Sequence, residues 1–222
     1  MKIIKKQLDI FVDKTCFVFD FDGVIKDSID VKTKAFQKIY EKEDSFILKK
    51  IREFHLNNGG VSRSEKFKYY EEVLLHNKVD EEKINKLCEE FSSLVKDEVV
   101  KCRPIPGVIK FLNNLRQKNK LILVNSATPL DELKEIILRC NYQKYFESVY
   151  GSPLTKSENL RSIIDDFEIK SDDIIFFGDA KSDLFAAKEL KIAFVGVGSY
   201  LKEMSKFPDK KNIFINNFNQ LI

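Results

Sequence analysis

The sequence predicts an α/β protein: a doubly wound parallel sheet with an all-α block inserted after the first strand. Short apolar runs of strand length recur along the 222 residues, and helical patterns separate most of them. Residues 28–101 break this rhythm, because they contain several amphipathic helical patterns and no convincing strand. We therefore expect a core made of residues 1–27 and 102–222, with a helical insertion at residues 28–101.

The first strand is predicted at residues 15–19, a run that is apolar and rich in β-prone residues. Acidic residues and Gly23 come directly after it, as expected where a buried strand ends in a turn. Five further apolar runs predict the remaining strands, at residues 121–124, 148–150, 174–177, 193–197 and 212–215.

Capping residues mark the starts of several helices. Ser62 with Glu65 and Thr155 with Glu158 have the spacing of a capping box. Thr128, directly before a proline, is expected to cap a further helix. Within the insertion, amphipathic patterns predict helices at residues 31–41, 62–76 and 80–99.

Composition and charge exclude several classes of protein. Apolar residues make up 43% of the chain, so a disordered chain is not expected. The 38 basic and 35 acidic residues leave a net charge of +3, which gives no support for nucleic-acid binding. No apolar run approaches the length of a membrane span, and none forms the core of a signal peptide.

The four cysteines, Cys16, Cys88, Cys102 and Cys140, lie too far apart in the sequence for a CxxC motif. Reduced thiols fit a cytosolic protein. We therefore expect a soluble, cytoplasmic protein with no membrane or nucleic-acid partner. We expect a monomer, because the sequence has no strong extra apolar helix.

Two carboxylates separated by one residue, Asp20 and Asp22, follow the first predicted strand. Because strand side chains alternate, both can point past the strand end, where open parallel sheets bind their ligands. One carboxylate could then attack phosphorus while the other protonates the leaving oxygen. Taken alone, the pair is explained equally well as an acidic turn or helix cap.

Polar groups also follow the strand predicted at residues 121–124. The hydroxyl of Ser126 and nearby backbone N–H groups could hold a phosphoryl oxygen at a helix start. Further along, Lys156 could offset the charge between a carboxylate and a phosphate. The ordinary alternatives are a helix cap at Thr128 and a surface lysine at position 156.

Asp179 and Asp183 stand four residues apart after the strand predicted at residues 174–177. Two carboxylates at a strand-to-helix junction suit Mg²⁺, which prefers oxygen ligands. Acidic residues favoured by a helix dipole are the ordinary alternative. Each group can be explained singly, but their joint occurrence at strand ends is harder to dismiss.

Together these groups resemble the haloacid dehalogenase superfamily of phosphatases, phosphomutases and dehalogenases. The resemblance covers the whole chain, from DFDGVIKDS at residues 20–28 through GDAKSD at residues 178–183 to AAKELKIAFVGV at residues 186–197. It implies a Rossmann-like core with a helical cap. It also implies a Mg²⁺-dependent phosphatase that hydrolyses a small phosphorylated metabolite, a sugar phosphate or hydroxy-acid phosphate, through an aspartyl-phosphate intermediate.

The resemblance also implies a role for each site residue. Asp20 would be the nucleophile, and Asp22 would act as general acid and then as general base. Ser126 would bind the phosphoryl group, and Lys156 would steady the nucleophile and the phosphate. The Mg²⁺ ligands would be Asp20, the backbone carbonyl of Asp22 and Asp179, with Asp183 as a further ligand or a support.

Two features separate the subclasses. Haloacid dehalogenases and phosphonoacetaldehyde hydrolases generally lack the second aspartate, so Asp22 argues for phosphate chemistry. A phosphomutase of the β-phosphoglucomutase type is the main alternative, because residues 60–63 look like its substrate loop. Those mutases carry a histidine where this chain has Lys32, which favours a phosphatase. A non-catalytic binding protein is the third possibility, and the presence of all the acids argues against it.

The expected cap contributes the predicted substrate contacts. The glycine-rich loop at residues 57–60 can turn tightly before a helix that Ser62 caps. Arg63 and Lys66, one turn apart, could then grip a carboxylate or a second phosphate. An ordinary capped helix with two solvated cations is the alternative. The complete predicted substrate-binding set is Gly23, Ala127, Thr128, Arg63 and Lys66.

Overall fold

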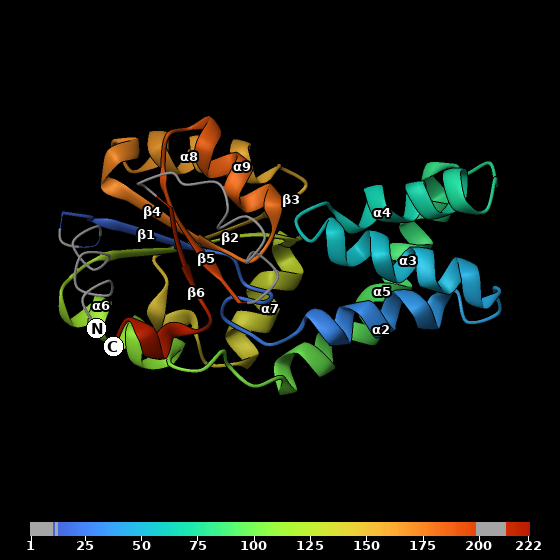
Figure 1. Ribbon diagram of the computed structural model, residues 1–222, viewed down its shortest axis with the longest axis horizontal. Coiled ribbons are helices and arrows are strands. Elements are labelled where there is room, and N and C mark those ends of the chain that lie inside the picture. The colour runs from blue at the N-terminus through green and yellow to red at the C-terminus, as the bar shows by residue number, and fades with distance from the viewer. Residues whose placement is uncertain (1–10, 12, 199–211) are drawn as a thin grey trace.

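The computed structural model describes residues 11, 13–198 and 212–222. Its centre is a parallel six-stranded sheet with the strand order β3-β2-β1-β4-β5-β6 (Figure 1). The strands are β1 Cys16–Phe19, β2 Leu121–Pro129, β3 Ser148–Ser152, β4 Ile174–Gly178, β5 Ala193–Val197 and β6 Asn212–Ile215. All the predicted strands are therefore present, and the predicted α/β class with a parallel sheet is confirmed.

The register of the sheet determines which side chains meet at its edge. Phe19, the last residue of β1, is level with Val124 of β2 and Phe177 of β4. Because the three strands are parallel, the residues that follow them emerge at the same edge. Asp20 therefore lies between the ends of β2 and β4.

Helices cover both faces of the sheet, as alternation of strands and helices predicts (Figure 1). Alternate side chains of β1 serve the two faces: Phe17 and Phe19 belong to one buried cluster, Cys16 and Val18 to the other. The first cluster includes residues of α6 and α7, and the second includes residues of α8 and α9. These helices are α6 Val108–Gln117, α7 Leu130–Arg139, α8 Lys156–Asp166 and α9 Lys181–Glu189.

The insertion forms a helical bundle beside the sheet, at the right of Figure 1. We refer to it below as the cap. An aromatic centre holds it together: the rings of Phe36 and Phe91 lie 4.3 Å apart, and Phe67 and Tyr70 pack against Phe36. Its elements are α2 Ile29–Ile39, α3 Ser45–Asn57, α4 Arg63–Tyr69, the π-helical turn Tyr70–Leu74 and α5 Glu81–Lys101.

Local structure departs from the sequence predictions in three places. The helix predicted at residues 62–76 changes to a π-helical turn after Tyr69. Helix α3 was not among the helices predicted for the insertion. The predicted helix cap at Thr128 is wrong, because β2 continues to Pro129 and the N-cap of α7 is Pro129.

Short 3₁₀ turns at Gln143–Tyr145, Ser171–Asp173 and Phe218–Gln220 complete the described secondary structure. Within the described residues, no helix has both the length and the apolar character needed to cross a membrane.

Candidate active site

Asp20 begins the site at the end of β1, where only 6% of the residue is exposed. Its carboxylate accepts a hydrogen bond from the backbone N–H of Phe21 at 2.6 Å and contacts the ammonium of Lys156 at 2.8 Å. The pKa of Asp20 is raised to about 6, because burial and the charges of nearby carboxylates together outweigh the opposing charge of Lys156. Lys156 therefore stabilises the ionised form of a buried carboxylate.

Lys156 is the first residue of α8, so the start of that helix fixes its position. The capping box predicted for Thr155 and Glu158 is present. The ammonium of Lys156 lies 2.8 Å from Asp20 and 2.9 Å from Asp183, and it donates to the carbonyl of Asn125 at 2.9 Å. Burial alone lowers the pKa of Lys156, but the two carboxylates outweigh burial and raise it.

Three carboxylates, those of Asp20, Asp179 and Asp183, have oxygens within 4.8 Å of one another. Burial raises the pKa of Asp179 well above its usual value, and the charges of Asp20 and Asp183 add to this effect. One oxygen of Asp183 accepts from the backbone N–H of Ala180 at 3.0 Å, and the other faces Lys156. A divalent cation would relieve the repulsion among these oxygens, so the donor set fits Mg²⁺.

Two glycines give the carboxylates room. A Cβ at Gly178 would lie 2.3 Å from the Cβ of Asp183, and a Cβ at Gly23 would lie 2.3 Å from a carboxylate oxygen of Asp179. Gly23 also has a φ of +76°, a conformation that glycine adopts readily. The structure thus gives Gly23 a specific role, which is to let Asp179 approach the loop after β1.

Asp22 is held by three side chains. It accepts hydrogen bonds from Ser28 at 2.5 Å and from Thr128 at 3.0 Å, and it forms an ion pair with Lys32. Burial raises the pKa of Asp22, but Lys32, Ser28 and Thr128 lower it further than burial raises it. Asp22 is consequently an ionised carboxylate in the free protein.

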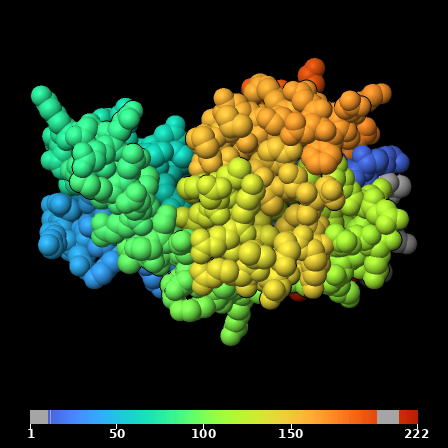
Figure 2. Space-filling model, turned by 180° about the vertical axis from the view of Figure 1, so that it is seen from behind, coloured from blue at the N-terminus to red at the C-terminus, as the bar shows by residue number. Residues whose placement is uncertain are grey.

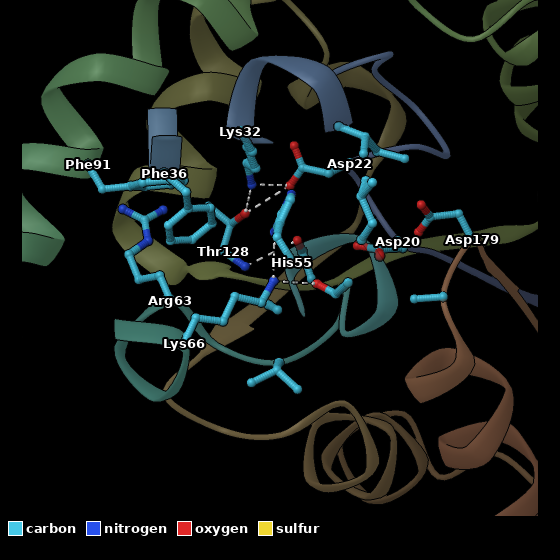
Figure 3. Close-up of a pocket in the computed structure, with 17 residues that line it drawn as sticks. Asp20, Asp22, Lys32, Phe36, His55, Arg63, Lys66, Phe91, Thr128 and Asp179 are labelled. Carbon is cyan, nitrogen blue, oxygen red and sulfur yellow. Dashed lines mark hydrogen bonds and ion pairs between the residues drawn. The ribbon is translucent and has the colours of Figure 1, made fainter. Parts of the chain in front are cut away.

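Lys32 is a site residue outside the set predicted from the sequence. It comes from α2 of the cap, and its ammonium contacts both Asp22 and the hydroxyl of Thr128, the latter at 2.8 Å (Figure 3). One feature of the sequence pointed to Lys32. It lies ten residues after Asp22, at the position where β-phosphoglucomutases carry a histidine. That comparison indicated a difference in chemistry but gave no contact partner.

A cavity between the core and the cap is lined by Asp20, Asp22 and Asp179. The three residues of the predicted phosphate-binding segment, Ser126, Ala127 and Thr128, also line it. Figure 2 shows the cap, coloured blue to green, in contact with the yellow and orange elements of the core. In Figure 3 the cap side chains lie on one side of the cavity, with Asp20 and Asp179 on the other. The charged cap residues that line it, together with a histidine, are Lys32, His55, Arg63 and Lys66.

Arg63 differs from the sequence expectation, because a partner within the protein occupies its guanidinium. Two of its nitrogens donate to the carboxylate of Glu132 in α7, at 2.6 and 2.8 Å. Ser92 is also within hydrogen-bond distance, and the ring of Phe91 lies 4.8 Å from the guanidinium carbon. Both charged partners are at most 8% exposed. Arg63 therefore fastens the cap to the core and is not free to bind a substrate anion here.

The loop before α4 also touches the core. A Cβ at Gly60 would lie 1.9 Å from the hydroxyl oxygen of Ser182, and a Cβ at Gly59 would lie 3.0 Å from the Cβ of Ala180. Neither glycine has a positive φ. Glycine is therefore needed at these two positions because the loop approaches the core closely, and not because the backbone conformation is unusual. Ser62 caps α4 in a capping box with Glu65, as predicted.

Comparison with known proteins agrees with this geometry. Residues 17–197 match the family Haloacid dehalogenase-like hydrolase. The chain belongs to this family. The match spans the strand ends that carry Asp20, Ser126 and Asp179, and the resemblance inferred from the sequence is confirmed.

Individual relatives in the family include phosphatases and mutases. The chain is 26% identical over 180 residues to the phosphorylated carbohydrates phosphatase of Thermotoga maritima, covering 79% of this chain and 81% of that one. The structure of β-phosphoglucomutase from Clostridium difficile matches with a TM-score of 0.76 and 20% identity, covering 94% and 93% of the two chains. A predicted phosphoglycolate phosphatase from Haemophilus somnus matches with a TM-score of 0.72 and 17% identity, covering 95% and 97%. The family match and the relative from Thermotoga maritima support the prediction of a phosphoric monoester hydrolase, while the two structures show that the fold is shared.

The buried pair between Arg63 and Glu132 generates a stability prediction. Arg63→Met should destabilise the fold by about 3–5 kcal/mol, because it leaves a buried carboxylate without its partner. Adding Glu132→Gln should restore most of this loss, since the charge is then removed. Urea unfolding of the single and double variants measures both effects.

The control is Arg161→Met, which removes one partner of the exposed pair with Glu189. Exposed pairs contribute about 0–1 kcal/mol, so this variant should stay near the wild type. If Arg63→Met costs no more than Arg161→Met, the role of the Arg63–Glu132 contact in fastening the cap is refuted.

Proposed function

We propose that this protein is a Mg²⁺-dependent phosphatase that transfers the phosphoryl group of a small phosphorylated metabolite to Asp20 and then to water. The observation that carries the proposal is the position of Lys156, whose ammonium lies 2.8 Å from Asp20 and 2.9 Å from Asp183. This arrangement holds a desolvated carboxylate ionised next to a cation. A nucleophile that must approach a negatively charged phosphate needs such an arrangement.

Asp20, Asp179 and the backbone carbonyl of Asp22 would hold Mg²⁺, with Asp183 supporting the site. Asp183 is better suited to support than to direct binding, because both of its oxygens already have partners in Ala180 and Lys156. When bound, Mg²⁺ supplies positive charge that offsets the charge of the phosphoryl oxygens.

In the first step, a carboxylate oxygen of Asp20 forms a bond to phosphorus while the bond from phosphorus to the leaving oxygen breaks. Ser126 and the backbone around Ala127 hold the phosphoryl oxygens. Asp22 gives a proton to the leaving alcohol. Although Asp22 is ionised in the free protein, a negatively charged substrate beside it raises its pKa and favours its protonated form.

In the second step, Asp22 accepts a proton from water, whose oxygen attacks phosphorus as the bond to Asp20 breaks. Inorganic phosphate leaves and Asp20 is restored. The contact between Lys32 and Asp22 supports this step, because it keeps Asp22 in the ionised form that can accept a proton. A phosphomutase would share the first step and return the phosphoryl group to a second hydroxyl.

The substrate is a sugar phosphate or a hydroxy-acid phosphate. The relative from Thermotoga maritima acts, by its name, on phosphorylated carbohydrates, which supports this class. The cavity at the site is lined partly by apolar cap residues, Phe36 and Phe91 among them, and partly by charged ones.

The proposal predicts phosphate release from at least one phosphorylated metabolite in the presence of Mg²⁺, and none after chelation. Asp20→Asn should reduce turnover to background, because an amide cannot act as the attacking carboxylate. A screen of sugar phosphates and hydroxy-acid phosphates, with released phosphate as the readout, measures this. Conversion of a sugar phosphate to an isomer with little free phosphate would instead identify a mutase. Full activity of chelated wild type or of Asp20→Asn would refute the mechanism.

A second prediction tests the acid role of Asp22. For an alkyl phosphate, Asp22→Asn should lower kcat/KM by about 10²–10⁴-fold, since the leaving alkoxide needs a proton. An aryl phosphate has a leaving group that needs little protonation, so its kcat/KM should fall much less. Asp27→Asn, at an exposed acid in the same loop, is the matched control and should behave as wild type. Equal losses of kcat/KM on both substrates would contradict the acid role.

A further inference from the structure

The cavity receives three cationic side chains from the cap, and two of them are neutralised within the protein. Lys32 is paired with Asp22, and Arg63 is paired with Glu132. Lys66 is the third, and it lies one helical turn after Arg63 on α4. Among the described residues, no carboxylate lies within 4.0 Å of its ammonium.

Lys66 is nevertheless almost fully enclosed, with only 3% of the residue exposed. Its ammonium contacts the Nδ1 atom of His55 at 3.1 Å and the carbonyl of Gly59 at 3.4 Å (Figure 3). Burial and the charge of Lys66 lower the pKa of His55 to about 2, so His55 is neutral and its Nδ1 accepts from Lys66. Both recorded partners of Lys66 are therefore neutral acceptors.

A buried ammonium without an anionic partner is unfavourable, and the effect is visible in its proton affinity. Burial and the neighbouring charge of Lys32 together lower the pKa of Lys66 to about 7, and the charges of Asp22 and Asp179 oppose this only in part. An anion placed beside Lys66 would remove this penalty. The cavity is the place from which such an anion would come, because Lys66 lines it together with Asp20 and Asp179.

We propose that Lys66 binds a second anionic group of the substrate, a carboxylate or a further phosphoryl group, while the first phosphoryl group lies at Asp20. This inference rests on the proposed phosphatase function and narrows its substrates to metabolites that carry, apart from the transferred phosphoryl group, a carboxylate or a second phosphoryl group. It also separates Lys66 from Arg63, which the Glu132 contact already occupies. Lys66 is thus the specificity-determining residue of the cap.

Substrates that differ only in the second group test this assignment. Phosphoglycolate is compared with the monophosphate of ethylene glycol, and fructose 1,6-bisphosphate with fructose 1-phosphate. The first pair tests a carboxylate and the second a further phosphoryl group. Wild-type kcat/KM should be at least about tenfold higher for the anionic member of one pair, as expected for a charge-assisted hydrogen bond.

Variants then assign the preference to a residue. Lys66→Met keeps the length of the side chain and removes its charge, so it should lower kcat/KM for the anionic member by about 10- to 100-fold. Activity on the neutral member should stay within about threefold. Lys66→Arg should retain part of the preference. Lys68→Met, at an exposed lysine on the same helix, is the matched control and should change neither activity.

A binding measurement separates this inference from the proposed function. With Mg²⁺ present, calorimetry should detect tighter binding of 3-phosphonopropionate than of propylphosphonate to wild type, and no such difference in Lys66→Met. This result without any phosphate release would overturn the phosphatase proposal and keep the Lys66 assignment. If wild type hydrolyses the substrates but prefers neither member of either substrate pair, the Lys66 assignment is overturned and the phosphatase proposal stands. Equal losses in Lys66→Met on both members would overturn it as well, because Lys66 would then serve the transferred phosphoryl group or the fold.

Discussion

The repulsion among carboxylates at one edge of the sheet is the constraint on which this site depends. Asp20, Asp179 and Asp183 are brought within 4.8 Å because β1 and β4 are adjacent and parallel. Lys156 offsets part of their charge from the start of α8, and the small volumes of Gly23 and Gly178 let the side chains approach. These carboxylates attract a cation, whereas a phosphate can approach them only where Lys156 and a bound cation offset their negative charge.

The sequence carried enough information to predict the core of this site. Strand ends are visible as apolar runs followed by acidic or polar residues, and parallel strands bring their carboxyl ends to one edge. For that reason Asp20, Ser126, Lys156 and Asp179 could be named together before any contact was known. Local signals were also reliable where a short pattern determines the geometry, as in the capping boxes at Ser62 and Thr155.

The contacts between cap and core could not be predicted in the same way. The pairing of Arg63 with Glu132 joins residues 69 apart in the sequence, and no local pattern marks it. The same holds for Thr128, whose expected role as a helix cap gave way to a hydrogen bond with Asp22. For Lys66 the sequence left two interpretations open, a substrate contact and a solvated cation, and its enclosure next to neutral acceptors is visible only in the structure. These contacts depend on how the cap packs against the core, and the periodicity of apolar residues in the sequence does not predict that packing.

The central claim is that Asp20 carries the phosphoryl group. The most direct test is to mix Asp22→Asn with an aryl phosphate and Mg²⁺, quench in acid, and determine the masses of the resulting peptides. The aryl leaving group allows the first step, and the loss of the base slows the second, so the intermediate should accumulate. The account predicts one phosphoryl group on the peptide that contains Asp20, and none when Asp20→Asn is added. A phosphoryl group on another residue, or turnover by a protein that is never modified, would contradict it.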